Sequence, residues 1–94
     1  DDLALIPNIY RLEQNYPNPF NPVTIINYEL PVTNYVKISI YNLLGQKVTT
    51  LVNEVQPAGY YEVRWDAAGY ASGVYYYKIE AGKFHDVKKM ILLR

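Results

Sequence analysis

The sequence predicts an all-β protein, an Ig-like antiparallel β-sandwich of about seven strands, with a small open-ended barrel as the lesser alternative. Polar and apolar residues alternate with a period of two, which is typical of strands that bury one face. Turn-forming Gly, Pro and Asn residues separate the alternating segments at the spacing found in sandwiches. No stretch repeats its apolar residues with the period of a helix.

The predicted strands follow one another along most of the chain, and a turn or loop ends each of them. Pro31 ends the first long strand, Gly45 provides a left-handed turn, and "QPAG" and "AGK" are further turns. A longer loop, "AAGYASG", precedes the sixth strand. The expected strands are a short one around 12–14 and longer ones at 23–30, 35–42, 47–55, 60–66, 74–80 and 84–94.

Alternation within each segment assigns its buried face. Segment 47–55 is less regular, because Leu51 and Val52 are adjacent apolar residues, and this predicts a bulge or an edge position. The facing of the last strand stays open, because residues 90–93 are all apolar. The inward residues expected in the other strands are Thr24, Ile26, Tyr28, Leu30, Val36, Ile38, Ile40, Tyr61, Val63, Trp65, Tyr75, Tyr77 and Ile79.

The stretch "NYPNPFNP", residues 15–22, places three prolines and three asparagines around Phe20, and we call it the proline segment. Each proline fixes its own φ and lacks an N–H donor, so this segment is stiff and cannot join the middle of a sheet. We expect it to cap one end of the sandwich, with Phe20 as a plug. Prolines at a sheet edge also deter pairing with other chains.

Size and composition indicate a single non-membrane domain. The chain has 94 residues, 9 basic and 9 acidic side chains, and no cysteine. The balanced charge gives no reason to expect nucleic acid or an anionic membrane as a partner, and no apolar run approaches the roughly 20 residues of a membrane helix. We interpret residues 1–11 as a linker from a preceding domain and residues 12–94 as the domain itself.

The sequence contains no recognisable catalytic, cofactor-binding or metal-binding constellation, and we expect no enzyme activity and no cofactor. His85 is the only histidine and the chain has no cysteine, which together exclude a Cys/His zinc site. Ser72 lies in a turn without a nucleophile elbow. The acidic residues that fall mostly on outward strand positions, where they keep the surface hydrated, are Glu29, Glu54, Glu62 and Glu80.

Two surface features leave alternatives open. Tyr60, Tyr70 and Tyr76 could form an aromatic platform for sugar rings, although tyrosines that fill the core and the sheet surfaces are the preferred interpretation. Lys88 and Lys89 could keep an edge strand soluble. The terminal strand could equally pair with a partner by β-augmentation.

Five blocks occur in order between about Leu12 and Arg94: "LEQNYPNPFNPVTIINYELP", "VKISIYNLLGQKVTTLVN", "AGYYEVRWDA", "ASGVYYYKIEAG" and "KKMILLR". Together they closely resemble the type A C-terminal sorting domain of the type IX secretion system, and more distantly the Ig-like domain of the flagellar hook-capping protein. Two positions depart from the common family pattern. Arg94 stands where many members end in lysine, and Ala67 stands where many have the glycine of Trp-Asp-Gly.

The resemblance implies a β-sandwich that acts as a sorting signal and not as an enzyme. Such a domain directs cargo attached at its N-terminal side through the periplasm and the outer-membrane translocon, to the cell surface or the extracellular space. A sortase-like cysteine peptidase commonly cuts the preceding linker. By this resemblance the candidate sorting residues are Pro17, Asn18, Pro19, Phe20, Asn21, Gly73, Tyr75, Lys88, Lys89 and Arg94.

Two rival functions are compatible with a sandwich of this kind. The first is a carbohydrate-binding or adhesive module appended to a surface hydrolase, with Tyr70 and Tyr76 contacting the glycan. The second is a structural spacer that stabilises a neighbouring domain. An enzyme ranks last, because no constellation supports one.

Overall fold

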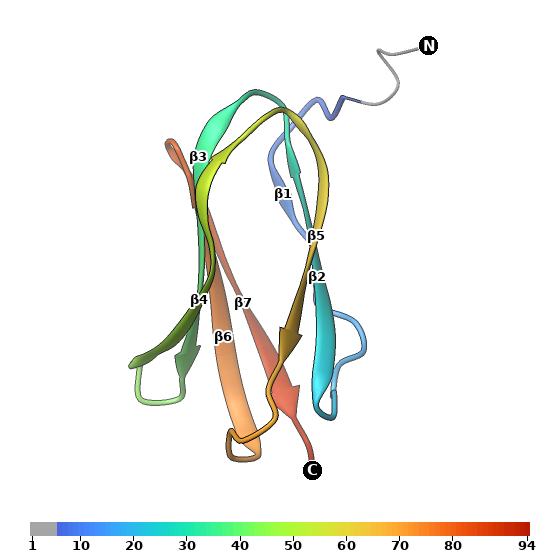
Figure 1. The fold of residues 1–94 in the computed structure, drawn as a ribbon, viewed down its shortest axis with the longest axis vertical. Coiled ribbons are helices and arrows are strands. Elements are labelled where there is room, and N and C mark those ends of the chain that lie inside the picture. The colour runs from blue at the N-terminus through green and yellow to red at the C-terminus, as the bar shows by residue number, and fades with distance from the viewer. Residues whose placement is uncertain (1–5) are drawn as a thin grey trace.

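The computed structural model describes residues 6–94, which form seven strands and no helix (Figure 1), as the alternation predicted. No helix in this part of the chain could therefore cross a membrane. The first strand is shorter than expected, and the others begin or end within a few residues of the predicted bounds. The strands are β1 (Arg11–Leu12), β2 (Val23–Leu30), β3 (Asn34–Asn42), β4 (Lys47–Gln56), β5 (Gly59–Asp66), β6 (Gly73–Ala81) and β7 (Phe84–Leu92).

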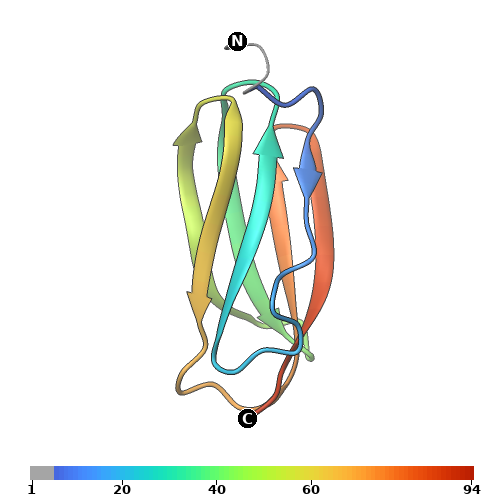
Figure 2. The same cartoon turned by 90° about the vertical axis from the view of Figure 1, so that its right-hand side faces the viewer.

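The strands form two facing antiparallel sheets, which confirms the predicted sandwich. One sheet has the order β1-β2-β5 and the other the order β4-β3-β6-β7. Figure 2 shows the two long sides of the sandwich: β4 and β5 lie along one side, and β1 and β7 along the other. Strand β1 pairs with β2 through only two residues. It therefore covers little of the core on the β1–β7 side, and another segment of the chain has to cover the remainder.

The core lies between the sheets and is rich in aromatic rings. Tyr28, Trp65 and Tyr77 are at most 3% exposed, and Tyr75 is 6% exposed, as the alternation predicted. Each buried aromatic side chain removes roughly 150–250 Å² from water, which adds to the burial of the leucine, isoleucine and methionine side chains in the same core. The Tyr28 and Tyr61 rings stack with centroids 5.2 Å apart.

Strand β4 has both a bulge and an edge position, the two explanations that its irregular alternation allowed. It is an edge strand, and its pairing with β3 shifts register so that Leu51 has no partner between Val52 and Thr50. The extra residue of such a bulge lets two adjacent apolar side chains lie against the protein. Leu51 and Val52 both pack against the core.

Strand β7 turns Met90 and Leu92 into the core, where both are fully buried, and Ile91 to the outer face. The same alternation places Asp86 and Lys88 on the inner side, where Lys88 Nζ lies 4.0 Å from Asp86 Oδ2. Charges on the inner side of an edge strand disfavour pairing of that edge with another chain.

The linker expected over residues 1–11 includes residues 1–5, which lie outside the described residues. The remainder contacts the sandwich. The Tyr10 ring stacks on Phe84 with centroids 4.9 Å apart, and its hydroxyl accepts a hydrogen bond from Asn34 Nδ2 at 3.0 Å. Arg11 is already part of β1.

Candidate functional site

The proline segment passes from one sheet to the other and closes the β1–β7 side of the sandwich (Figure 2). At its start, the backbone N–H groups of Tyr16 and Ile25 each donate to the other residue's carbonyl at 2.9 Å, so the segment is attached to β2. Four residues later, Phe20 forms a parallel bridge with Leu92 of β7. The peptide bonds that precede Pro17, Pro19 and Pro22 are cis.

Hydrogen bonds join this segment to the outer edge of β7. The Phe20 N–H donates to the Ile91 carbonyl, and the Leu93 N–H donates to the Phe20 carbonyl, both at 2.9 Å. The Ile91 N–H donates to Asn18 Oδ1 at 2.9 Å, and Gln14 Nε2 donates to the Lys89 carbonyl at 2.8 Å. A partner strand could therefore add to β7 only over residues 84–88, so the terminal residues are not an open edge for β-augmentation.

Phe20 is buried, as expected of a plug. Its side chain is 2% exposed, and its ring centroid lies 5.7 Å from that of Trp65. Trp65 in turn contacts the rings of Tyr70 and Tyr75, each with a centroid separation of 5.5 Å. Tilted and edge-on ring pairs of this kind are favourable arrangements. This aromatic cluster fills the end of the sandwich at which the chain terminates.

Asn15 anchors the start of the proline segment, and sequence reasoning missed it. The side chain is 2% exposed. Its Nδ2 donates to Thr24 Oγ1 at 2.9 Å and to the Pro17 carbonyl at 3.2 Å, and its Oδ1 accepts from Gln14 Nε2 at 2.7 Å. Thr24 Oγ1 also donates to the Pro17 carbonyl at 2.9 Å. The sequence held one signal for this buried polar contact: Thr24 is a polar residue on an otherwise apolar inward face, and a buried hydroxyl needs a hydrogen-bond partner.

Tyr77 completes this buried polar network from the opposite sheet. The backbone N–H of Asn15 donates to the Tyr77 hydroxyl at 2.8 Å, and this hydroxyl donates to the Glu13 carbonyl at 2.6 Å. Burial raises the pKa of the Tyr77 phenol from 10.0 to about 12, although the hydrogen bond from Asn15 lowers it. The network thus ties β6 to the chain that enters the proline segment.

The raised pKa of Tyr77 predicts a loss of stability at high pH. The folded state holds this proton more tightly than the unfolded state, so the stabilisation is complete below pH 10 and is lost as the pH rises through about 12. At about 1.4 kcal/mol per pKa unit, we expect the unfolding free energy to fall by up to about 2.5 kcal/mol over this range. Urea denaturation at several pH values between 9 and 12 measures this decrease in unfolding free energy.

The matched variant for this pH experiment is Tyr77→Phe, which has no proton to lose at this position. Burial also raises the pKa of Tyr28, so only the difference between the two proteins reports on Tyr77. Equal slopes of unfolding free energy against pH in wild type and variant would contradict the prediction.

The end of the chain contacts the loop 67–72. Arg94 Nε donates to the Tyr70 carbonyl at 2.9 Å, and an Nη of Arg94 donates to the Ala67 carbonyl at 3.0 Å. Gly73 pairs with Leu92, and the Tyr75 hydroxyl donates to the Ala71 carbonyl at 2.6 Å. The predicted sorting residues Gly73, Tyr75 and Arg94 therefore lie at the same end of the sandwich as Phe20.

Lys88 and Lys89 point to opposite faces of β7. Lys88 lies on the inner side of β7 beside Asp86, whereas Lys89 points to the outer face and is exposed. Successive strand residues point to opposite faces, so the structure divides the basic block that the sequence had grouped.

The three candidate sugar-binding tyrosines are also separated, and the interpretation as one platform is wrong. Tyr60 lies on the outer face of β5, and Tyr76 lies on the outer face of β6, which belongs to the opposite sheet. Tyr70 lies in the loop 67–72, packs on Trp65, and its hydroxyl is 3.4 Å from the Val48 carbonyl.

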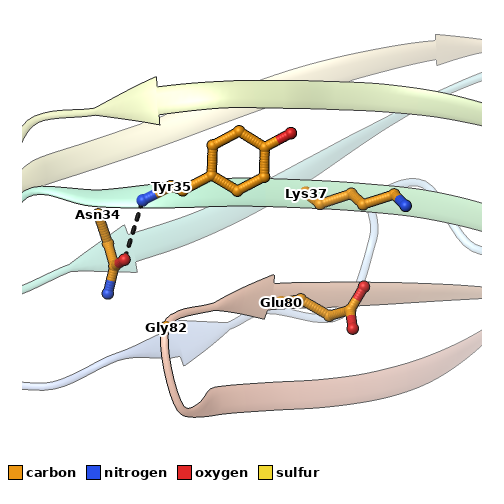
Figure 3. Close-up of a pocket in the computed structure, with 5 residues that line it drawn as sticks. All are labelled: Asn34, Tyr35, Lys37, Glu80 and Gly82. Atoms are coloured by element: carbon orange, nitrogen blue, oxygen red, sulfur yellow. Dashed lines mark hydrogen bonds between the residues drawn. The ribbon is translucent and has the colours of Figure 1, made fainter.

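A shallow pocket lies at the far end of the sandwich and is lined by Asn34, Tyr35, Lys37, Glu80 and Gly82 (Figure 3). Its volume is about 430 Å³. The Asn34 amide is already used, because its oxygen accepts from the Tyr35 N–H at 2.9 Å and its nitrogen donates to Tyr10. Residues 6–94 contain no cluster of three or more metal-ligating side chains.

These features define an Ig-like β-sandwich module whose distinctive surface is built from an N-terminal proline segment and the C-terminal strand. The chain belongs to the family of secretion system C-terminal sorting domains, whose family model matches residues 14–93. It is a sorting signal of type IX secretion and directs attached cargo toward the cell surface or the extracellular space. No curated protein and no solved structure matches the chain.

Proposed function

We propose that the secretion machinery recognises the folded surface formed by the proline segment and the end of β7, and not a flexible terminal peptide. The observation that carries this proposal is the set of backbone hydrogen bonds between Phe20 and residues 91–93. They hold Asn18, Asn21 and Arg94, all exposed, at one end of a rigid sandwich. A preorganised surface binds with a lower entropic cost than a disordered tail.

In this proposal the cargo is attached on the N-terminal side of the linker, residues 1–11, passes through the periplasm, and crosses the outer membrane by the type IX translocon, which binds this surface. A sortase-like peptidase then cuts before β1. Residues 6, 8 and 9 support the last step, because they lie outside the strands and are exposed, Ile6 and Ile9 by 45% and 54%, although Pro7 is buried and Tyr10 packs on Phe84. Exposed loop and terminal segments are the usual sites of proteolysis.

We also propose that this domain itself has no catalytic role. Sorting domains of this family are in general non-catalytic. His85 is exposed on the outer side of β7 and has no hydrogen-bond partner among the described side chains.

An export assay tests the recognised surface. Residues 1–94 are fused to a periplasm-directed fluorescent protein in a host that carries the type IX system. The variant Asn18→Ala/Asn21→Ala/Arg94→Ala removes exposed polar groups from the proposed surface. We expect the fraction of fluorescent protein reaching the cell surface to fall about tenfold, as expected for loss of central contacts at an interface.

The control variant, Thr33→Ala/Asn27→Ala/Lys83→Ala, removes three exposed polar groups away from this end. Its export should equal that of the wild type, and circular dichroism should show that both variants fold. Wild-type export by the folded test variant would overturn the proposed surface. Failure of the unmodified fusion to leave the periplasm would instead count against recognition of this domain by that secretion system.

A further inference from the structure

The outer face of the four-stranded sheet carries an excess of positive charge. Strand alternation and register place four lysines and one carboxylate on it. The outer face of the three-stranded sheet carries two arginines and three carboxylates. The chain as a whole is neutral, so the sandwich separates its charges between its two faces. The charged residues of the positive face are Lys37, Lys47, Lys78, Lys89 and Glu80.

One row on this positive face crosses all four strands in the order Lys47, Tyr41, Tyr76, Lys89. Tyr41 is the register partner of both Lys47 and Tyr76, and Tyr76 is the partner of Lys89. With neighbouring strands about 4.8 Å apart, the row is about 14 Å long. Both lysines are exposed and, among residues 6–94, neither forms an ion pair. The row therefore places an ammonium group at each end and two tyrosine rings, whose hydroxyls can donate or accept hydrogen bonds, in the middle.

The adjacent row contains a buried polar group, the hydroxyl of Ser39. Ser39, two residues before Tyr41, is 2% exposed, and its hydroxyl is the only buried side-chain polar atom in residues 6–94 without a hydrogen-bond partner. Its register partner is Lys78. Buried polar groups in folded proteins nearly always have a partner.

We propose that this positive face, centred on the Lys47–Tyr41–Tyr76–Lys89 row, docks an acidic protein surface during export. The proposal rests on the proposed function and adds a second contact surface to it. Charge complementarity identifies the partner as acidic. Tyr41 and Tyr76 lie between the two lysines of the row, and the aliphatic pair Val74 and Ile91 forms the next row beside it. These side chains favour a protein over a lipid surface, because protein interfaces combine an apolar, aromatic centre with a polar rim.

Binding is tested with the purified chain and three probes: a deca-glutamate peptide, vesicles containing phosphatidylglycerol, and a neutral oligosaccharide. We expect the peptide to shift the amide NMR signals of Tyr41 and Tyr76 at low salt. Raising NaCl to about 0.5 M should weaken binding about tenfold or more, because exposed charge interactions are then strongly screened. Binding of the vesicles or the oligosaccharide but not of the peptide, or no binding at all, would overturn the proposal.

The export assay gives the second test. Lys47→Glu/Lys89→Glu should reduce surface display about tenfold, since reversing interface charges slows association and repels the partner. Arg64→Glu/Lys83→Glu changes the net charge equally at exposed positions off the positive face, and should export normally. If the wild type is exported and both double variants match it, this proposal fails while the sorting function stands. If the wild type is not exported, it is the sorting function in that host that fails.

Discussion

Replacement of Phe20 by alanine is expected to lower the unfolding free energy by about 3–5 kcal/mol. The ring is 2% exposed and packs on Trp65 at the end of the sandwich. Its removal opens a cavity that the stiff segment around it is poorly able to fill, because the flanking residues are held to both β2 and β7. Urea denaturation at pH 7, followed by tryptophan fluorescence, measures the change.

The control for this experiment is Tyr16→Ala, which lies in the same segment but has a side chain 78% exposed. This variant should stay within about 0.5 kcal/mol of the wild type, as most surface substitutions do. A loss of less than 1 kcal/mol for Phe20→Ala, on the order of that surface value, would show that the segment does not close the core.

The second large effect is expected for Tyr77→Phe, which keeps the ring and removes one hydroxyl. This hydroxyl accepts from the Asn15 N–H and donates to the Glu13 carbonyl. The substitution leaves both backbone groups without this partner. At about 1–3 kcal/mol for each buried group left unpaired, the unfolding free energy should fall by about 2–4 kcal/mol.

Tyr76→Phe is the matched variant for Tyr77→Phe. It changes the neighbouring residue of the same strand, and no hydrogen bond joins the Tyr76 hydroxyl to another described residue, so we expect almost no change in stability. Hydrogen exchange offers a more local measurement. The Asn15 amide should exchange faster in Tyr77→Phe relative to the core amides of β3, and unchanged relative protection would contradict the assigned hydrogen bond.

Much of the fold could be predicted because strand alternation reports burial directly. The inward positions of β2, β3 and β6 were read correctly from the sequence, since each strand has one clearly apolar face. The same rule left the facing of β7 open, because residues 90–93 are all apolar. Ile91 is accommodated on the outer face beside Val74, its register partner, and only the sheet order reveals that neighbour.

The candidate site was less predictable, because its contacts join residues that are distant in the chain. Sequence reasoning identified Phe20 as a plug but could not find Asn15, whose partners depend on the packing of two sheets. It grouped Lys88 with Lys89 through proximity in the chain, although alternation separates adjacent residues. Whether Asn18, Asn21 and the terminal basic residues take part in recognition stays a prediction.

The bond between Asn18 and Ile91 joins residues 73 positions apart, and this has a consequence for quality control. Neither partner presents the surface alone, so a receptor that binds both residues binds only a domain in which β7 is present and folded against the proline segment. A cargo whose last strand has been clipped by a protease would offer half of the recognition surface and be left behind. The sorting signal would thus also restrict export to cargo whose sorting domain is intact and folded.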